Sequence, residues 1–352
     1  NNFFYNDSYK IGEIHFADNS VFYLSETGLT LDQSDRTDNM TINGTDYDDT
    51  IIGGFGNDTI NAGDDDDVIT GGKGNDTLNG GYGRDTYIYN LGDGVDTINE
   101  TRGNDKIKFG AGITLNDLKF TQEGNNLRII IQNDVNQSIL ISDFYRNINY
   151  QIENLVFADG STFNLSTQGI TLQQTDADDT VNGTSYNDVI YGNGGHDTIN
   201  AGDGNDTLIG GIGNDILNGG NGDDTYIYNL GDGFDTISES GGNDKIVFGE
   251  GISQNNLSFE QIGNHLKISI NGEDNKGIQI NNQFDSASNK VETIEFHDGS
   301  TLDISNADQL IQAMNSFSIS NSASTDALSN PTQDVSDMYS LAASQDLTRK
   351  AI

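Results

Sequence analysis

A nine-residue period rich in glycine and aspartate constrains this chain more than any other feature. Five consecutive nonapeptides cover residues 44–88, and five more cover residues 183–227. In every nonapeptide the sixth residue is Asp and the eighth is Ile, Leu or Tyr, and the early places are mostly Gly. Self-similarity at a fixed period is the signature of a repeat architecture, in which each unit stacks on its neighbours.

The chemistry of one nonapeptide predicts a turn followed by a short strand. Six residues rich in Gly and Asn suit the positive-φ conformations of a tight turn. Three residues such as Thr-Ile-Asn then form a strand that turns one apolar side chain inward. One coil therefore takes two nonapeptides, or 18 residues, and turns on the same side stack together with their aspartates.

The chain also repeats itself over a longer distance. Residues 41–165 match residues 180–304 at a constant offset of 139, without gaps. A partial third copy opens the chain, where Phe16 falls on Phe157. We therefore expect the chain to start inside a unit and to be the C-terminal piece of a longer protein.

Composition excludes several classes of function. The chain has 16 Lys and Arg against 55 Asp and Glu, a formal net charge of −39. Nucleic-acid binding of the usual kind needs a basic surface, and so does electrostatic binding to anionic membranes. There is no Cys, and no apolar run approaches the roughly 18 residues that a transmembrane helix needs. GxSxG, HExxH and P-loop motifs are absent, so we expect no enzyme activity in this chain, although an enzyme domain upstream of it stays open.

The stacked turns predict a metal site. A column of carboxylates surrounded by glycine carbonyls is unstable alone, and a hard cation with oxygen ligands satisfies it. Ca²⁺ suits such a site because it accepts many oxygens in flexible geometry, whereas Mg²⁺ demands a tight octahedron. The four histidines are scattered and show no metal-ligand spacing.

These nonapeptides resemble the RTX, or haemolysin-type, calcium-binding repeats of secreted bacterial proteins. The resemblance implies an all-β fold with two parallel β-rolls, each followed by a small β-module, and a weakly helical C-terminal tail. It also implies that the Asp of one turn shares a Ca²⁺ with backbone carbonyls of the next turn on the same side. The side-chain ligands are then Asp49, Asp58, Asp67, Asp76, Asp85, Asp188, Asp197, Asp206, Asp215 and Asp224. The backbone ligands are expected at Gly53, Gly54, Gly56, Gly71, Gly72, Gly74, Gly80, Gly81, Gly83, Gly192, Gly194, Gly202, Gly204, Gly210, Gly211, Gly213, Gly219, Gly220 and Gly222.

Some positions depart from the repeat. Thr and Tyr replace glycines in the first nonapeptide of each roll, so the edge sites at 44–52 and 183–191 are expected to be the least complete. Four later aspartates keep an Asp-x-Ile step out of strict register, and the sequence leaves open whether they are further ligands or a cap. They are Asp96, Asp105, Asp235 and Asp244.

Changes in composition and periodicity along the sequence predict the domain boundaries. We expect the end of a preceding β-module with a linker at 1–40, a first roll at 41–109, a first β-module at 110–165, a linker at 166–179, a second roll at 180–248, a second β-module at 249–304 and a secretion signal at 305–352.

The tail has its own composition, because Gly disappears after the second β-module. Apolar residues at 310, 311, 314 and 317 have the spacing of an amphipathic helix. The tail resembles the uncleaved export signal that type I secretion transporters recognise; docking of this helix on the last β-module is the alternative.

The sequence therefore predicts an extracellular calcium-binding region that folds on Ca²⁺ outside the cell and leaves the cell through a type I transporter. Two alternatives remain open. The β-modules of an adhesin would bind a glycan or a host surface, or the chain is the tail of a secreted toxin or hydrolase.

Overall fold

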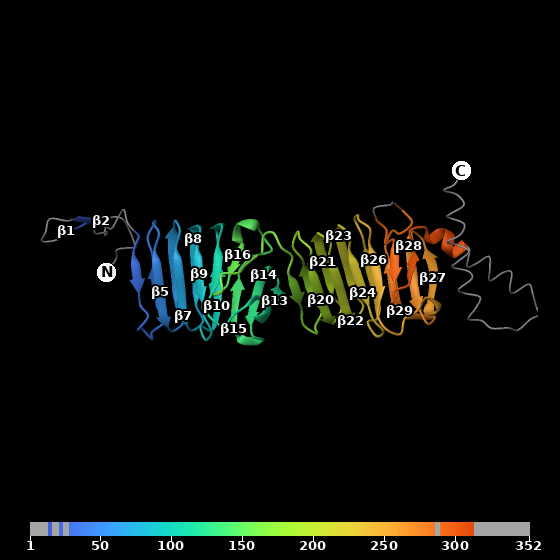
Figure 1. Ribbon diagram of the computed structural model, residues 1–352, viewed down its shortest axis with the longest axis horizontal. Helices are drawn as coiled ribbons and strands as arrows, with labels where there is room; N and C mark the ends of the chain where they lie inside the picture. The colour runs from blue at the N-terminus through green and yellow to red at the C-terminus, as the bar shows by residue number, and fades with distance from the viewer. Residues whose placement is uncertain (1–12, 16–20, 24–27, 286–288, 313–352) are drawn as a thin grey trace, which may run out of the picture. The chain divides into compact units, whose positions relative to one another are not determined.

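The computed structural model describes residues 13–15, 21–23, 28–285 and 289–312, and it separates into two compact units (Figure 1). The units are Asn1–Gln168 and Gly169–Ile352. Each contains two long sheets, in which the strands of the roll pair in parallel and follow one another along the stack. The expected fold class, all-β with two parallel β-rolls each followed by a β-module, is confirmed.

In the first unit, strands alternate between the two sheets as the chain advances, so each sheet receives every second strand of the roll. One sheet has the order β4 (Thr41–Asn43), β6 (Thr59–Asp64), β8 (Thr77–Gly83), β10 (Val95–Asn99), β15 (Asp134–Ile141), β14 (Asn126–Ile131) and β13 (Leu118–Glu123), with β11 (Arg102–Gly103) beside β8. The other has the order β3 (Thr30–Asp32), β5 (Thr50–Phe55), β7 (Val68–Lys73), β9 (Thr86–Tyr89), β12 (Lys106–Phe109), β16 (Asn154–Val156) and β17 (Thr162–Asn164).

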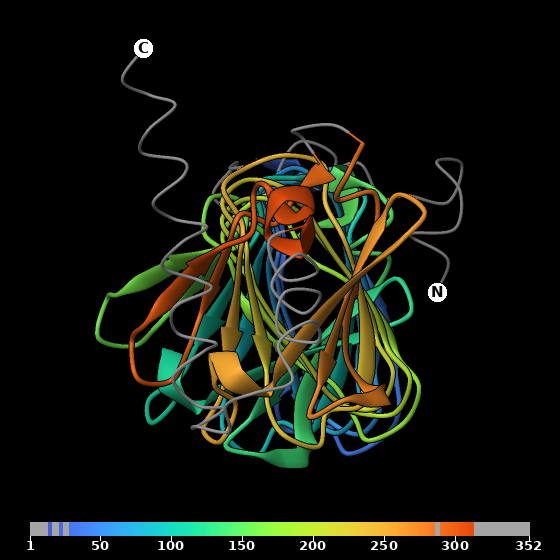
Figure 2. The same ribbon diagram turned by 90° about the vertical axis from the view of Figure 1, so that its right-hand side faces the viewer.

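The second unit repeats this topology, and its yellow and orange strands separate into two sheets in Figure 2. One sheet has the order β19 (Thr180–Asn182), β21 (Thr198–Asp203), β23 (Ile216–Asn221), β25 (Phe234–Ser238), β29 (Glu273–Ile280), β28 (His265–Ile270) and β27 (Leu257–Ile262). The other has the order β18 (Thr171–Gln173), β20 (Val189–Gly194), β22 (Thr207–Ile212), β24 (Thr225–Tyr228), β26 (Lys245–Phe248), β30 (Thr293–Glu295) and β31 (Thr301–Asp303).

The core of each roll is a narrow file of side chains from the eighth place of the nonapeptide. Ile51, Ile60 and Ile69 are completely buried, and Leu78 and Tyr87 are nearly so. Parallel pairing in register sets each of these above its counterpart 18 residues away, as Ile51 on Ile69. Each strand of the nonapeptides therefore contributes its eighth-place side chain to the interior, and β9 adds a second one, Tyr89.

Polar ladders hold the same register on the outside of the sheet. The amide Nδ2 of Asn61 donates to Oδ1 of Asn43 at 2.8 Å, and Nδ2 of Asn79 donates to Oδ1 of Asn61 at 2.8 Å. Asn99 continues the ladder by donating to Asn79 at 2.8 Å. A slip of one residue in the register would break every one of these bonds.

The β-modules continue the sheets of the rolls. In the first unit β13, β14 and β15 form an antiparallel meander, and β15 pairs in parallel with β10 of the roll. The antiparallel pair β16 and β17 extends the other sheet through β12. The short 3-10 helices η2 (Leu115–Asp117), η3 (Ile148–Tyr150) and η4 (Gln254–Asn256) lie within the two modules.

Strands also come from segments outside the predicted rolls. β3 lies within 1–40 and β18 within 166–179, and each pairs with the first strand of its sheet in the nonapeptides. The predicted domain boundaries remain predictions. The partial third copy has structural support, because β1 (Glu13–His15) pairs with β2 (Val21–Tyr23) in the register of β16 and β17.

Only the beginning of the predicted tail helix lies in the described part of the chain. Residues 307–312 are helical, and Ala307 and Leu310 are buried. The remainder of the tail, 313–352, is outside the described residues. Among the helices that the structure describes, none has both the length and the apolar character to cross a bilayer.

Candidate metal centres

The sixth-place aspartates form two columns in each unit, as the stacking predicts. We call these the aspartate columns. All ten predicted aspartates are buried, with exposures of 0–1%. The members of the columns are, in chain order, Asp49, Asp67, Asp85 and Asp105; Asp58, Asp76 and Asp96; Asp188, Asp206, Asp224 and Asp244; and Asp197, Asp215 and Asp235.

One hydrogen bond builds each step of a column. The backbone N–H of an aspartate donates to Oδ1 of the aspartate one coil further on, as Asp49 to Asp67 at 2.7 Å and Asp58 to Asp76 at 2.7 Å. This bond fixes the orientation of the carboxylate and gives one of its two oxygens, Oδ1, a backbone donor. Asp96 and Asp105 accept the same bond across an offset of 20 residues, from Asp76 at 3.0 Å and Asp85 at 2.8 Å. These two aspartates therefore extend the columns.

The other oxygen of most carboxylates has no hydrogen-bond partner. Among the described residues, Oδ2 is buried and unpaired in Asp58, Asp67, Asp76, Asp85, Asp105, Asp197, Asp206, Asp215, Asp224 and Asp244. A buried acceptor without a partner costs about 1–3 kcal/mol, and more when it is charged. The repeated orphan oxygen therefore fits a cation, because a hard cation accepts carboxylate oxygens as ligands.

The turns bring glycine backbone against these oxygens. A Cβ placed on Gly71, the first residue of its nonapeptide, would lie 2.3 Å from Oδ2 of Asp76. The main chain therefore lies close to the carboxylate at the first place, where the repeat carries Gly or, at Ala62 and Ala201, a buried Ala. Where the fourth place of the nonapeptide is Gly it takes a positive φ, such as 126° at Gly56.

In the nonapeptide 192–200 two neighbouring glycines differ in conformation, and the role of Gly194 as a backbone ligand stays a prediction. Gly194 is the third residue of its nonapeptide and does not take a positive φ, whereas Gly195, the fourth residue, has φ 109°. Gly195 is therefore the equivalent of Gly56 and Gly74. Asn193 takes the positive φ of the second place, at 74°, because Asn tolerates this conformation better than most residues.

The first aspartate of each first column differs from the aspartates that follow it. Oδ2 of Asp49 accepts from the hydroxyl of Thr45 at 3.1 Å, and Oδ2 of Asp188 accepts from the hydroxyl of Thr184 at 3.0 Å. The backbone N–H of each Thr also donates to the same oxygen. The threonines that replace glycines thus give this oxygen hydrogen-bond donors, whereas Oδ2 of Asp67 and Asp206 has none; how complete the calcium sites at these edges are stays a prediction.

Sequence reasoning missed two pairs of glutamates. Glu153 and Glu292 end the first columns, because the N–H of Asp105 donates to Oε2 of Glu153 at 2.6 Å and the N–H of Asp244 to Oε2 of Glu292 at 2.8 Å. Both come from the β-modules, where their matching positions in the long repeat were the only available signal. The second pair, Glu100 and Glu239, lies beside the last Asp of each roll.

Burial dominates the electrostatics of the columns. It raises the pKa of Asp67 to about 8, that of Asp206 to about 7 and that of Asp224 to about 6, and neighbouring carboxylates add to each rise. The N–H donor from the preceding coil opposes the rise but does not cancel it. Without a cation, the folded columns therefore bind protons more tightly than an exposed carboxylate does.

The raised pKa values predict how the calcium-free chain responds to pH. An unfolded Asp has a pKa near 4, so the folded state gains stability from these groups below that pH and loses it as the pH rises through about 6 to 8. In EDTA, far-UV circular dichroism should show more β structure at pH 5 than at pH 8. A β signal that stays constant over this range would contradict the prediction.

Comparisons with known proteins agree with the geometry. A family model for the RTX calcium-binding nonapeptide repeat matches residues 41–69, 61–98, 174–208 and 200–235. A model for the haemolysin-type calcium binding protein related domain matches 126–167 and 265–306, within the β-modules. No curated protein matches the chain.

One similar solved structure is the extracellular lipase LipA from Serratia marcescens. It shares 22% sequence identity, with a TM-score of 0.26, over 63% of this chain and 37% of the lipase. The chain thus spans well under half the length of that lipase. The two family models together match more than half of the residues, in both long repeats. The chain belongs to the RTX, or haemolysin-type, calcium-binding repeat proteins.

Proposed function

We propose that this chain is the region of a secreted protein that stays open inside the cell and folds on Ca²⁺ outside it. The single observation that carries the proposal is the set of buried Oδ2 atoms without partners in the aspartate columns. The side chains of Asp58, Asp67, Asp76 and Asp85, with their matches in the second unit, would hold the ions. The glycine carbonyls of the stacked turns would supply further oxygens.

The same carboxylates oppose folding when no cation is present. The chain carries a formal net charge of −39, and its columns stack like charges one coil apart. Because the apolar core is narrow, it offers little to offset this repulsion. Binding free energy from Ca²⁺ then becomes folding free energy. Extracellular modules bind Ca²⁺ with Kd on the order of 10⁻⁴–10⁻³ M, so millimolar Ca²⁺ outside the cell suffices.

An open, acidic chain suits export through a narrow transporter. We propose that the tail from 305 carries the type I export signal, on its resemblance to such signals. The burial of Ala307 and Leu310 supports docking of the first helical turn on the second β-module. We therefore place the part of the tail that the transporter recognises after residue 312. Glycan or host-surface binding by the β-modules, and a toxin or hydrolase upstream, are the alternative proposals.

The first test is folding itself. In EDTA at pH 7.5 the chain should give a largely unstructured far-UV spectrum, and ~5 mM Ca²⁺ should induce the β signal. The same concentration of Mg²⁺ serves as the control and should induce much less, because Mg²⁺ needs tight octahedral geometry. Identical β spectra in EDTA and in Ca²⁺ would overturn the proposal.

A matched pair of substitutions tests which aspartates bind. Oδ2 of Asp206 has no partner, whereas Oδ2 of Asp188 accepts from Thr184. Asp206→Ala should therefore raise the Ca²⁺ concentration at half-folding, on the order of tenfold, and lower the cooperativity. Asp188→Ala should change both less. A calcium titration followed by circular dichroism measures this, and equal effects or the reverse order would contradict the assignment.

Two truncations separate export from docking. Deletion of 313–352 should leave calcium-induced folding intact and abolish secretion from a cell with a matching type I transporter. Deletion of 305–352 removes Ala307 and Leu310 as well, so it should also lower the stability of the calcium-bound protein by about 1–3 kcal/mol. Normal secretion of the shorter deletion would rule out the export signal, whatever its stability.

A further inference from the structure

The last nonapeptide of each roll carries a tyrosine in the eighth place instead of Ile or Leu. These residues are Tyr87 and Tyr226, and both are buried. The hydroxyl of Tyr87 donates to Oε1 of Glu100, and the hydroxyl of Tyr226 donates to Oε1 of Glu239. Each tyrosine thus fixes a buried glutamate that lies outside the nonapeptides.

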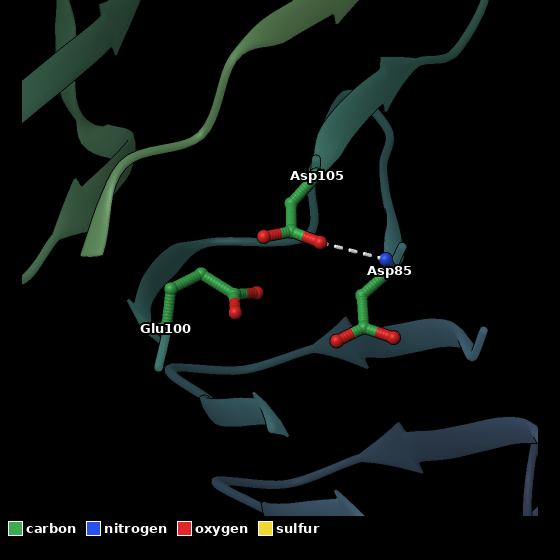
Figure 3. Close-up of side chains that lie close together, drawn as sticks. All are labelled: Asp85, Glu100 and Asp105. Atoms are coloured by element: carbon green, nitrogen blue, oxygen red, sulfur yellow. Dashed lines mark hydrogen bonds between the residues drawn. The ribbon is translucent and has the colours of Figure 1, made fainter. Parts of the chain in front are cut away.

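Each glutamate joins two aspartates of the first column. One carboxylate oxygen each from Asp85, Glu100 and Asp105 lies within 4.8 Å of the other two, and all three residues are buried (Figure 3). The dashed line in Figure 3 is the bond from the N–H of Asp85 to Oδ1 of Asp105, at 2.8 Å. Asp224, Glu239 and Asp244 form the same group in the second unit.

Hydrogen bonding does not account for this convergence. Oδ2 of Asp85 and Oδ2 of Asp105 are buried without partners, and both residues are completely buried. Oδ2 of Asp224 and Oδ2 of Asp244 repeat this in the second unit. Unpaired buried oxygens beside a third carboxylate are unstable unless a cation or protons neutralise them.

The group also differs from the rest of the columns. Within the part of the chain that the structure describes, carboxylates gather in threes only at these two places. Along the middle of a column, successive carboxylates come from two aspartates, such as Asp67 and Asp85. The space between Asp85 and Asp105 therefore offers one more carboxylate ligand, from Glu100, than the space between Asp67 and Asp85.

We propose that each roll ends in a cation site of its own kind, in which Asp85, Glu100 and Asp105, or Asp224, Glu239 and Asp244, bind one Ca²⁺ through three carboxylates. This inference rests on the proposed function, because it assumes that the columns bind Ca²⁺. Affinity for Ca²⁺ rises with the number of charged ligands and with the rigidity of the site. The tyrosine supplies rigidity by holding the glutamate, so this site binds more tightly than the sites in the middle of the column.

A double substitution of the glutamates tests the site in the full chain. Glu100→Gln with Glu239→Gln keeps an acceptor for each tyrosine hydroxyl and removes one charge from each group. Equilibrium dialysis against buffered Ca²⁺, with bound metal counted by atomic absorption, should show the tightest-binding ions shifted to a free Ca²⁺ concentration about tenfold higher. The weaker sites should change little.

The control is the pair Glu123→Gln with Glu250→Gln, because both glutamates are exposed and lie outside the columns. It should bind Ca²⁺ like the wild type. A glutamate double variant that binds the same number of ions at the same concentrations as this control would overturn the inference. Failure of the wild type and the control to bind Ca²⁺ would instead overturn the proposed function.

A second measurement decides the case in which the glutamate variant does not fold. The chain has no Trp, so emission from bound Tb³⁺ on ultraviolet excitation depends on nearby tyrosines. Tyr87→Phe with Tyr226→Phe keeps all three carboxylates and removes the hydroxyls beside the site. Sensitised Tb³⁺ emission should fall at least twofold while the number of bound ions stays the same. Unchanged emission would overturn the inference, because no ion then lies beside these tyrosines.

Discussion

The structure depends on one hydrogen bond, from the backbone N–H of an aspartate to Oδ1 of the aspartate one coil later. It holds each turn on the next, as from Asp67 to Asp85 at 2.9 Å, and it turns the second oxygen into the interior of the column. The same bond therefore creates both the stack and its electrostatic problem. A fold built this way needs a positive charge wherever Oδ2 has no protein partner.

The hydrophobic core contributes less to stability than the neutralised columns do, because it is narrow. Each strand of the nonapeptides contributes its eighth-place side chain, so the interior is a file of residues such as Ile60 and Leu78 between two sheets. A core of this width fixes the register in which the strands pair, and the hydrogen bonds between stacked asparagines fix the same register. Stability then comes in large part from whatever neutralises the carboxylates. The proposal that the chain folds on Ca²⁺ rests on this division.

The ends of the rolls show how a repeat stops. Thr45 and Thr184 satisfy the first carboxylate of each first column with hydroxyl and N–H donors, so the column begins without an orphan oxygen. At the other end, Glu153 and Glu292 reach from the β-modules and accept the last N–H of the column. The β-modules thus complete the rolls as well as extending their sheets. Terminal units of a repeat protein generally differ from internal ones in this way.

The repeat, the class of fold and the aspartates that line the columns could be predicted from the amino-acid sequence alone. A fixed period leaves few choices, because Gly and Asp at constant places dictate a turn and the Ile or Leu two places after the Asp dictates a buried strand. The sequence did not show whether Asp96 and Asp105 continue the columns. The spacing between stacked aspartates changes there from 18 to 20 residues, and no local rule says which aspartate then stacks on which.

Only the tertiary structure decided which groups meet across longer distances. Glu153 reaches a residue 48 positions earlier, and Glu100 meets Tyr87 across 13 residues that follow no period. Such contacts depend on how the β-module folds back on the roll, which side-chain periodicity does not encode. The period thus fixed the aspartate columns, and the packing of the non-repetitive segments fixed their ends.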